Sequence, residues 1–333
     1  MVKKIINKAI LTNKIPCDSK KVQTIINEEY LQGPSSFNIL PDSSIIVADE
    51  CDNKLKIFSL DGSFVKVINL DKNAFHYPID VISRNDILYI TDKYNHRIIA
   101  IDMSGKILWI AGGYGKAKGK LKEPYGITFI DEETLAISDS GNARIVFYSI
   151  NGTFVDFFGR KGIGKEYYES ISFKTKVIYK LWNNSVSRFQ TIDTNFIDSG
   201  FDIGTLESPK GITCNNDKIY VCDYSGRLQV FSVKGELLKT YYQNREYGEN
   251  LFSYIQWIEV INNNIYFTRE LGNSIYVIEK DGSINTFFQY KGHYIEKFHF
   301  HDEYIYFMSP WERKLFRINI KEENSATKDT KNN

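Results

Sequence analysis

Histidines in the C-terminal part of the sequence are the residues whose type and spacing could bind a metal. His299 and His301 stand two positions apart in the segment KFHFH, and residues two apart on a strand point to the same side. Two imidazoles placed in this way could share a transition metal, with His293 or Glu296 as a further ligand. The alternative, which we favour, is that these histidines are packed or solvated without a metal. We therefore predict no cofactor and keep a divalent metal as the alternative.

Two segments rich in lysine and glycine could contact phosphate or acidic groups. Residues 159–165, GRKGIGK, match most of a phosphate-binding P-loop, but Glu166 stands where that loop needs Ser or Thr to hold magnesium. We interpret this segment as a loop between strands. Residues 115–122, GKAKGKLK, could contact an acidic partner, and a solvated loop is the alternative. The lysines concerned are Lys116, Lys118, Lys120 and Lys122.

A repeated segment supplies the strands that must position these residues. Each copy consists of an apolar strand, an aspartate, a short polar turn, a second apolar strand, a glycine turn and a third apolar strand. Clear copies span residues 45–68, 88–111, 135–158 and 219–242. A degenerate copy at 170–193 and two partial copies at 265–288 and 304–320 continue the pattern. The period of about 40–47 residues is typical of a propeller blade.

The aspartates, asparagines and glycines of the repeat predict its turns. The aspartates are Asp49, Asp92, Asp139 and Asp223, with spacings of 43, 47 and 84 residues. We interpret each as the acceptor of an Asx-turn, with backbone N–H groups of the following turn as donors. Asparagines three or four positions later suit a left-handed turn: Asn53, Asn95 and Asn142. Glycines end the next turn, where a positive φ favours them: Gly62, Gly105, Gly152, Gly235 and Gly282.

A proline precedes each clear copy and opens a fourth strand, where its missing N–H is tolerated. These prolines are Pro34, Pro78, Pro124 and Pro209. The positions that follow them would face the mouth of a central channel if the blades surround an axis. Asp80, Tyr125 and Lys210 are the candidate residues at that mouth.

The turn after two of the aspartates resembles the NHL repeat. The matching positions are Asp92, Asn95, His96 and Arg97 in one copy and Asp139, Asn142 and Arg144 in the next. This resemblance implies a β-propeller of NHL type over residues 34–320. It says little about activity, because the family includes scaffolds, RNA-binding proteins and lyases. The lyases of this type carry histidines near the strand-opening prolines, whereas Ile79, Tyr125 and Lys210 follow them here.

We predict an all-β chain with one propeller domain over residues 20–320. The spacing of 84 residues is two periods, so seven blades are expected, with six as the alternative. A strand within residues 20–30 should complete the last blade and close the ring. Residues 1–19 form an N-terminal segment or edge strand, and residues 321–333 form a disordered polar tail.

Composition argues against several classes of protein. A net charge of +1, from 42 basic and 41 acidic residues, disfavours a nucleic-acid binder. The sequence shows neither a signal-peptide pattern nor an apolar run long enough to span a membrane. Its four cysteines form no C-x-x-C pair, which disfavours a structural zinc site. We expect a cytoplasmic monomer.

The leading functional prediction is a non-enzymatic scaffold that binds a protein or peptide on one face of the propeller. It depends on the repeat fold, on aromatic-rich turns, and on the lack of a Ser/His/Asp or Cys/His set that the sequence lets us assemble. The alternative is a propeller lyase or hydrolase with a metal near the channel. RNA binding through one face is a third hypothesis, and the neutral charge counts against it.

Overall fold

Strands dominate the fold, in keeping with the abundance of β-branched and aromatic residues. The computed structural model describes residues 21–320, except residues 69, 71–73, 162–204, 225–226, 242–253 and 280–281. In this part of the chain, no helix has the length and apolar character needed to cross a membrane. The segments 1–19 and 321–333, which we assigned to the two ends, lie outside the described residues.

The strands form six four-stranded antiparallel sheets, the blades, in the described residues. Blade 1 contains β2 (Pro34–Ile39), β3 (Ile45–Asp49), β4 (Lys54–Phe58) and β5 (Phe64–Ile68). Blade 2 contains β6 (Pro78–Arg84), β7 (Ile87–Asp92), β8 (Arg97–Asp102) and β9 (Ile107–Gly112). Blade 3 contains β10 (Pro124–Phe129), β11 (Thr134–Asp139), β12 (Arg144–Ser149) and β13 (Phe154–Phe158), with the 3-10 turn η2 (Ser140–Asn142) between β11 and β12.

The other three blades follow the same order. Blade 4 contains β16 (Pro209–Asn215), β17 (Lys218–Asp223), β18 (Arg227–Ser232) and β19 (Leu237–Tyr241). Blade 5 contains β20 (Ile255–Ile261), β21 (Asn264–Arg269), β22 (Ser274–Ile278) and β23 (Ile284–Gln289). Blade 6 contains β24 (Phe298–His301), β25 (Tyr304–Ser309), β26 (Lys314–Asn319) and β1 (Gln23–Ile26).

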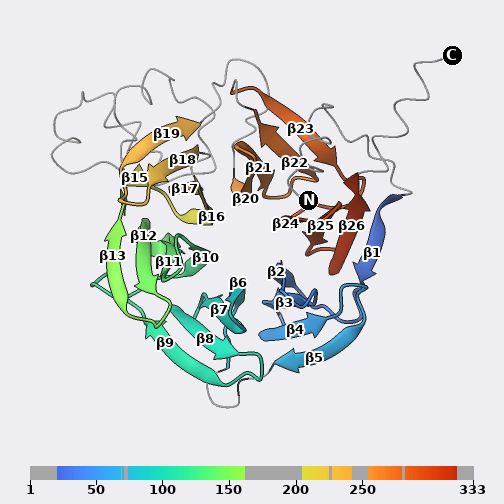
Figure 1. Cartoon of the computed structure of the whole chain (residues 1–333), viewed down its shortest axis with the longest axis horizontal. Coiled ribbons are helices and arrows are strands. Elements are labelled where there is room, and N and C mark those ends of the chain that lie inside the picture. Colours follow the sequence, from blue (N-terminus) through green and yellow to red (C-terminus); the bar gives the residue numbers. More distant parts are fainter. Residues whose placement is uncertain are drawn as a thin grey trace.

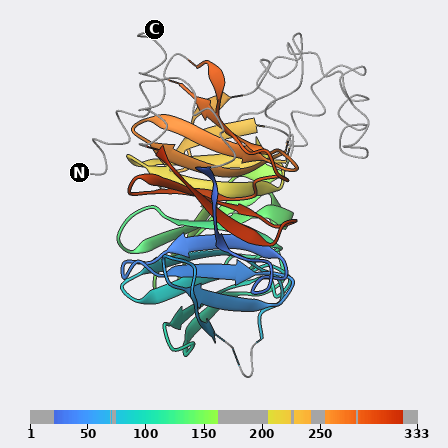
Figure 2. The same cartoon turned by 90° about the vertical axis from the view of Figure 1, so that its right-hand side faces the viewer.

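The blades surround a central axis, with the first strand of each blade innermost and the fourth at the rim (Figure 1). Figure 2 shows the same ring edge-on, with successive blades stacked along it. The inner strands all begin on one face, which we call the mouth face. The turn after the second strand of each blade and the link to the next blade lie on this face, because antiparallel strands reverse direction at every turn.

The blade count corrects our prediction of seven to six. Each of the six interfaces between neighbouring blades holds its own hydrophobic cluster among the described residues. The cluster between blades 3 and 4 joins Ile145 and Phe147 to Ile219 and Phe231, so these two blades pack directly on each other. The degenerate copy at 170–193 lies outside the described residues, in the segment that links short parallel strands β14 (Arg160–Lys161) and β15 (Thr205–Leu206).

The predicted closure of the ring is confirmed. Strand β1 pairs antiparallel with β26, with Gln23 opposite Arg317 and Thr24 opposite Phe316. Ile26 is buried in the cluster between blades 6 and 1, beside Leu315. The last blade is therefore built from both ends of the propeller domain, and its outer strand comes from residues that precede blade 1 (Figure 1).

The predicted strand starts and glycine turns are also confirmed. The four prolines are the first residues of β2, β6, β10 and β16. All five glycines of the repeat have positive φ. At Gly152 the reason is also steric, because an added Cβ would lie 2.7 Å from Cδ2 of Trp109 on the neighbouring blade. The turns therefore set how closely one blade approaches the next.

Candidate functional site at the channel mouth

The repeated aspartate fixes the start of the inner strand in each clear blade. In blade 2, the Asp92 carboxylate accepts hydrogen bonds from the His76 backbone N–H at 2.7 Å, from Asn95 Nδ2 at 2.8 Å and from Arg97 Nε at 2.7 Å. His76 lies in the link that precedes the inner strand, 16 residues upstream of Asp92. The aspartate therefore ties that link to the second and third strands, and it positions the residues that follow Pro78.

The other clear blades use the same arrangement. Asp139 accepts from the Lys122 backbone N–H, from Asn142 and from Arg144. Asp49 accepts from the backbone N–H groups of Gln32 and Gly33 and pairs with Lys56 at 2.7 Å. Asp223 accepts from the Glu207 backbone N–H and pairs with Arg227 at 2.7 Å. The Arg or Lys of the third strand is thus part of the motif in every one of these blades.

These contacts correct our Asx-turn interpretation of the aspartates. The donors lie upstream in the link and on the third strand, and the Asp139 carboxylate makes no capping bond to the 3-10 turn that follows it. The left-handed residue of that turn is His96 or Ala143, although it is Asn53 in blade 1. Asn95 and Asn142 instead donate to the aspartates through their side-chain amides. These amides reach the buried carboxylates, whereas the backbone N–H groups of the turn do not.

The residue after the first position of each inner strand lies at the channel mouth. Strand register aligns Pro34, Pro78, Pro124, Pro209 and Ile255 opposite the ends of the second strands. In blade 6 the Glu296 backbone N–H donates to Met308 O, which aligns Ile295 with them. The mouth positions are therefore Ser35, Ile79, Tyr125, Lys210, Gln256 and Glu296.

Three of these side chains form a hydrogen-bond network across the axis. Tyr125 Oη donates to Glu296 Oε1 at 3.2 Å, and Gln256 Nε2 donates to the same oxygen at 2.6 Å and to Tyr125 Oη. Tyr294, in the link before β24, also interacts with Glu296. Tyr125 and Gln256 are buried. The network joins blades 3, 5 and 6.

Blades 1, 2 and 4 supply the other side chains at the mouth. Glu50, next to Asp49, interacts with the Tyr77 hydroxyl at the start of blade 2. Lys93, next to Asp92, and Lys210 of blade 4 both lie over the ring of Tyr125, with Nζ 5.8 Å and 4.2 Å from its centroid. All six blades thus supply side chains to one group, which we call the mouth cluster. It comprises Glu50, Tyr77, Lys93, Tyr125, Lys210, Gln256, Tyr294 and Glu296.

Burial shifts the pKa values of the charged members of the mouth cluster. The pKa of Glu50 is raised to about 7, chiefly by desolvation, although the Tyr77 hydrogen bond opposes the shift and the nearby Glu296 adds to it. Desolvation also raises the pKa of Glu296. The pKa of Lys210 is lowered by desolvation and by the positive charge of Lys93. Groups with such perturbed pKa values concentrate at functional sites.

The raised pKa of Glu50 predicts a pH-dependent stability. Between the ordinary value of 4.5 and about 7, the folded protein keeps a proton that the unfolded chain has released. Stability should therefore fall as the pH rises through this range. Glu50→Gln should remove this pH dependence. The difference in unfolding free energy between the variant and the wild type should therefore be more favourable to the variant at pH 8 than at pH 4, by on the order of 2–3 kcal/mol. Urea unfolding at several pH values measures it.

A matched control separates this effect from a general response to acid. Glu132→Gln removes a carboxylate whose side chain is 92% exposed, so its unfolding free energy should differ little from that of the wild type at any of these pH values. A Glu50→Gln curve that runs parallel to the wild-type curve from pH 4 to pH 8 would contradict the assignment.

A buried ion pair lies one layer below the mouth cluster. Lys297 Nζ lies 3.0 Å from Asp80 Oδ1 and donates to Ser36 Oγ at 2.8 Å, and it lies 3.9 Å from the centroid of the nearer Trp257 ring. Asp80 Oδ2 also accepts from the Ile127 backbone N–H at 3.1 Å. Of the three mouth residues predicted from the sequence, Tyr125 and Lys210 lie in the mouth cluster, and Asp80 lies one layer below it.

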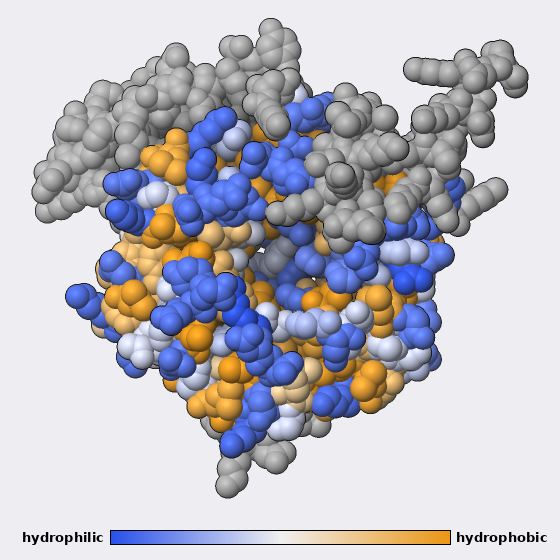
Figure 3. Space-filling model, viewed as in Figure 1, coloured by the Kyte–Doolittle hydropathy of each residue, from blue (hydrophilic) through white to orange (hydrophobic). Residues whose placement is uncertain are grey.

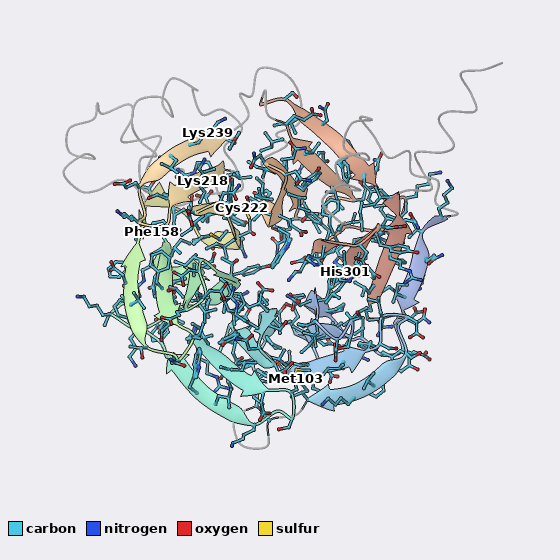
Figure 4. The ribbon with its side chains drawn as sticks, viewed as in Figure 1. Met103, Phe158, Lys218, Cys222, Lys239 and His301 are labelled. Atoms are coloured by element: carbon cyan, nitrogen blue, oxygen red, sulfur yellow. The ribbon has the colours of Figure 1, made fainter. Side chains whose placement is uncertain are left out.

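The histidines proposed as metal ligands are divided between the two ends of β24. His299 and His301 lie side by side, with ring centroids 6.4 Å apart, and His299 Nδ1 lies 3.1 Å from Glu259 Oε1. Figure 4 shows His301 on the inner part of blade 6. His293 lies before β24, against Trp311. The described residues contain no group of three or more His, Cys, Asp or Glu side chains that could hold a metal.

The absence of a tightly bound metal remains a prediction. Elemental analysis of protein purified without chelators would check it.

The lysine loop lies on the mouth face, in the link between β9 and β10. Lys116, Lys118 and Lys120 are exposed, and Lys122 is partly buried. Arg144 holds this link by donating to the backbone carbonyls of Lys116 at 2.9 Å and of Lys120 at 2.7 Å. Most of the P-loop-like segment 159–165 lies outside the described residues.

A separate groove lies between blades 1 and 2 on the opposite face. Its volume is about 590 Å³, and Leu40, Ile57, Leu60 and Met103 line it. Met103 is seen at this position in Figure 4. The lining is mainly aliphatic and hydroxyl-bearing, and it holds none of the perturbed titratable groups of the mouth cluster. Figure 3 shows one face of the ring, with a hollow on the axis that has hydrophilic residues on its border.

Sequence reasoning missed Glu50, Lys93 and Gln256, and it named Glu296 only as a possible metal ligand beside the histidines. For Glu50 and Lys93 a signal existed, since each directly follows a repeated aspartate. Tyr125 and Lys210 were identified because each directly follows a proline. Gln256 and Glu296 follow Ile255 and Ile295 instead, so the same criterion could not identify them.

Comparison with known proteins supports the fold and leaves the family open. No protein-family model matches the sequence. A stretch of 109 residues is 30% identical to the chloroplastic protein SUPPRESSOR OF QUENCHING 1 of Arabidopsis thaliana. This match covers 30% of the chain and only 10% of that protein. The chain thus spans about a tenth of this curated relative.

Several solved structures share the propeller architecture. A gluconolactonase from Xanthomonas campestris gives a TM-score of 0.61 at 11% identity, covering 92% of this chain and 94% of that one. Virginiamycin B lyase from Staphylococcus aureus gives a TM-score of 0.56 at 15% identity, covering 90% and 99%. The WD40 propeller domain of Doa1 gives 0.53 at 10% identity, covering 85% and 77%. At these identities the similarity establishes the β-propeller fold alone.

Proposed function

We propose that this protein is a binding propeller that holds a peptide or a protein segment on its mouth face. The observation that carries this proposal is the mouth cluster, in which side chains from all six blades meet at the axis. A ligand placed there contacts every blade at once, and rigid strands position each contact. Such convergence is typical of the binding faces of propellers.

Exposed aromatic side chains on the same face support this proposal. Tyr30, Tyr94, Tyr114 and Trp311 are 39%, 43%, 68% and 65% exposed, and all four lie in links or turns of the mouth face. Tyr and Trp are enriched among the residues that dominate the energy of protein interfaces. Other large hydrophobic side chains that are exposed lie mainly on the outer strands, such as Leu108 on β9 and Leu238 on β19.

Peptide display tests this function. Peptides selected from a random library on the wild-type protein should bind at least about 10-fold more weakly to a Tyr94→Ala, Trp311→Ala double variant, because truncation of central aromatic contacts commonly costs more than 1.4 kcal/mol. A Leu108→Ala, Leu238→Ala variant, changed on the outer strands, should bind as the wild type does. Equal binding to both variants, or failure to enrich any peptide, would overturn the proposal.

A second candidate function is acid–base catalysis in the mouth cluster. The observation in its favour is that two carboxyl groups with raised pKa values, Glu50 and Glu296, lie beside tyrosine hydroxyls in one cluster. The lyase and the gluconolactonase among the structural neighbours lend it support at the level of the fold. Hydrolysis of δ-gluconolactone and of p-nitrophenyl esters would test it. Activity should disappear in Glu296→Gln and persist in Glu259→Gln.

A further inference from the structure

Hydrogen-bond acceptors in the mouth cluster already have donors. Glu296 accepts from Tyr125 and Gln256, and the Tyr294 and Tyr77 hydroxyls interact with Glu296 and Glu50 respectively. These partners are neutral hydroxyl and amide groups, and Lys210 and Lys93 attract Glu296 and Glu50 without donating a hydrogen bond to them. Because buried polar groups are normally hydrogen-bonded, the carboxylates do not call for an additional cationic ligand.

The two ammonium groups of the cluster, in contrast, have no hydrogen-bond acceptor in the described part of the chain. Among the described residues, Lys93 and Lys210 make neither a hydrogen bond nor an ion pair through Nζ, and their Nζ atoms face aromatic rings. Glu296 and Glu270 attract Lys210, and Glu50 attracts Lys93, without direct contact. Lys93 Nζ lies 5.3 Å and 5.0 Å from the ring centroids of Tyr77 and Tyr94, and both ammonium groups face the ring of Tyr125. Each ammonium offers three donors, and both are only partly buried. The cluster therefore lacks an acceptor.

We propose that Lys93 and Lys210 together bind one carboxylate of an acidic peptide, above the ring of Tyr125. This inference rests on the proposed binding function and deepens it by naming the ligand class. The carboxylate supplies the missing acceptor and compensates two ammonium groups at once. Charge-assisted hydrogen bonds of this kind are roughly twice as strong as neutral ones.

Two further features favour a peptide over a small free anion. The exposed Lys116, Lys118 and Lys120 lie on the same face and add positive charge outside the axis, where further acidic residues of one chain would meet it. The Lys297–Asp80 pair below is already ion-paired, so the ammonium groups without such a partner lie at the mouth, within reach of a side chain or chain end of a peptide on this face. The high pKa values of Glu50 and Glu296 reduce the negative charge that would oppose the ligand.

Fluorescence anisotropy with three defined probes tests the inference. The first probe is a labelled, N-acetylated and C-amidated tetraglutamate, the second is the matching tetraglutamine, and inorganic phosphate serves as an unlabelled competitor. Tetraglutamate should bind and tetraglutamine should not. Lys93→Met and Lys210→Met should each weaken tetraglutamate binding at least about 10-fold, since each removes a charge-assisted hydrogen bond to the carboxylate.

Lys239→Met is the matched control. Lys239 lies on the outer strand β19 (Figure 4), and its Nζ faces the ring of Tyr241 at 4.3 Å, so the substitution removes the same kind of cation–π contact away from the axis. This variant should bind tetraglutamate as the wild type does. Thermal unfolding of all three variants shows that the losses do not come from misfolding.

The outcomes separate this inference from the proposed function. If tetraglutamate does not bind, or if its binding survives Lys93→Met and Lys210→Met, the proposed carboxylate site at Lys93 and Lys210 is wrong. Displacement of the probe by phosphate as effectively as by unlabelled tetraglutamate overturns the peptide carboxylate in favour of a general anion site. If display-selected peptides still require Tyr94 and Trp311 in either case, the proposed binding function is kept and only the carboxylate site at Lys93 and Lys210 is rejected.

Discussion

Replacing Asp80 with alanine is expected to lower the free energy of unfolding by about 3–5 kcal/mol, because it leaves a buried ammonium without its carboxylate. Lys297 and Asp80 are 5% and 0% exposed, and their charged atoms lie 3.0 Å apart. Burial already lowers the pKa of Lys297. Loss of its proton would therefore relieve part of the cost at high pH but would not restore the lost contacts with Asp80.

A double variant distinguishes the charge from the packing. Asp80→Asn combined with Lys297→Met removes both charges and keeps an acceptor for the Ile127 backbone N–H, so it should recover most of the stability that Asp80→Ala loses. Urea unfolding with unchanged m-values measures all three proteins. If Asp80→Ala is as stable as the wild type, the ion pair contributes nothing to holding blades 2 and 6 together.

Asp139→Ala should lower the free energy of unfolding by roughly 3 kcal/mol, since it removes three hydrogen bonds and strands a buried guanidinium. The lost bonds come from the Lys122 backbone N–H, Asn142 and Arg144. Arg144 keeps its bonds to backbone carbonyls of the β9–β10 link, which holds the cost below that of a fully isolated charge.

Asp102→Ala is the control, because Asp102 forms the kind of turn that Asp139 does not. Its Oδ1 accepts from the backbone N–H groups of Ser104 and Lys106 in a local turn near the surface. Loss of such local side-chain bonds at the surface should change the free energy of unfolding much less than the loss of Asp139 does. Equal losses in Asp139→Ala and Asp102→Ala would restore the local-turn interpretation of the repeated aspartates.

The parts of the fold that could be predicted are those that local chemistry determines. Prolines at strand starts, glycines at positive φ and the recurrence of aspartate follow from backbone sterics and hydrogen bonding, which repeat from blade to blade. The pairing of residues 23–26 with blade 6 was also accessible, because the last copy ends one strand short and an alternating segment precedes the first.

The number of blades could not be predicted from local chemistry in the same way. A spacing of 84 residues equals two periods, but whether 170–193 forms a blade depends on the geometry of ring closure and not on its own alternation. The direct packing of Phe158 of blade 3 on Phe231 of blade 4, with ring centroids 4.8 Å apart, decides the question. The role of the aspartates was missed for a related reason, since their donors lie 16 or 17 residues upstream and on another strand.

The candidate site was predicted only where an offset from proline pointed to it. Tyr125 and Lys210 were found in this way, whereas Gln256 and Glu296 lie in blades that have lost both the proline and the aspartate. Their approach to Tyr125 spans 131 and 171 residues of sequence. No local pattern reports contacts over that distance, because the ring alone brings these residues together.

The closure of the ring by β1 has a consequence for how this protein folds during synthesis. Gln23 and Arg317, which pair across β1 and β26, are separated by 294 residues. A ribosome therefore releases β1 long before its partner exists, and the strand must wait with unpaired backbone groups while blades 1 to 5 form. Contacts of such long range slow folding, and a waiting edge strand is a site of wrong pairing. Completion of the propeller therefore cannot occur before β26 has been synthesised.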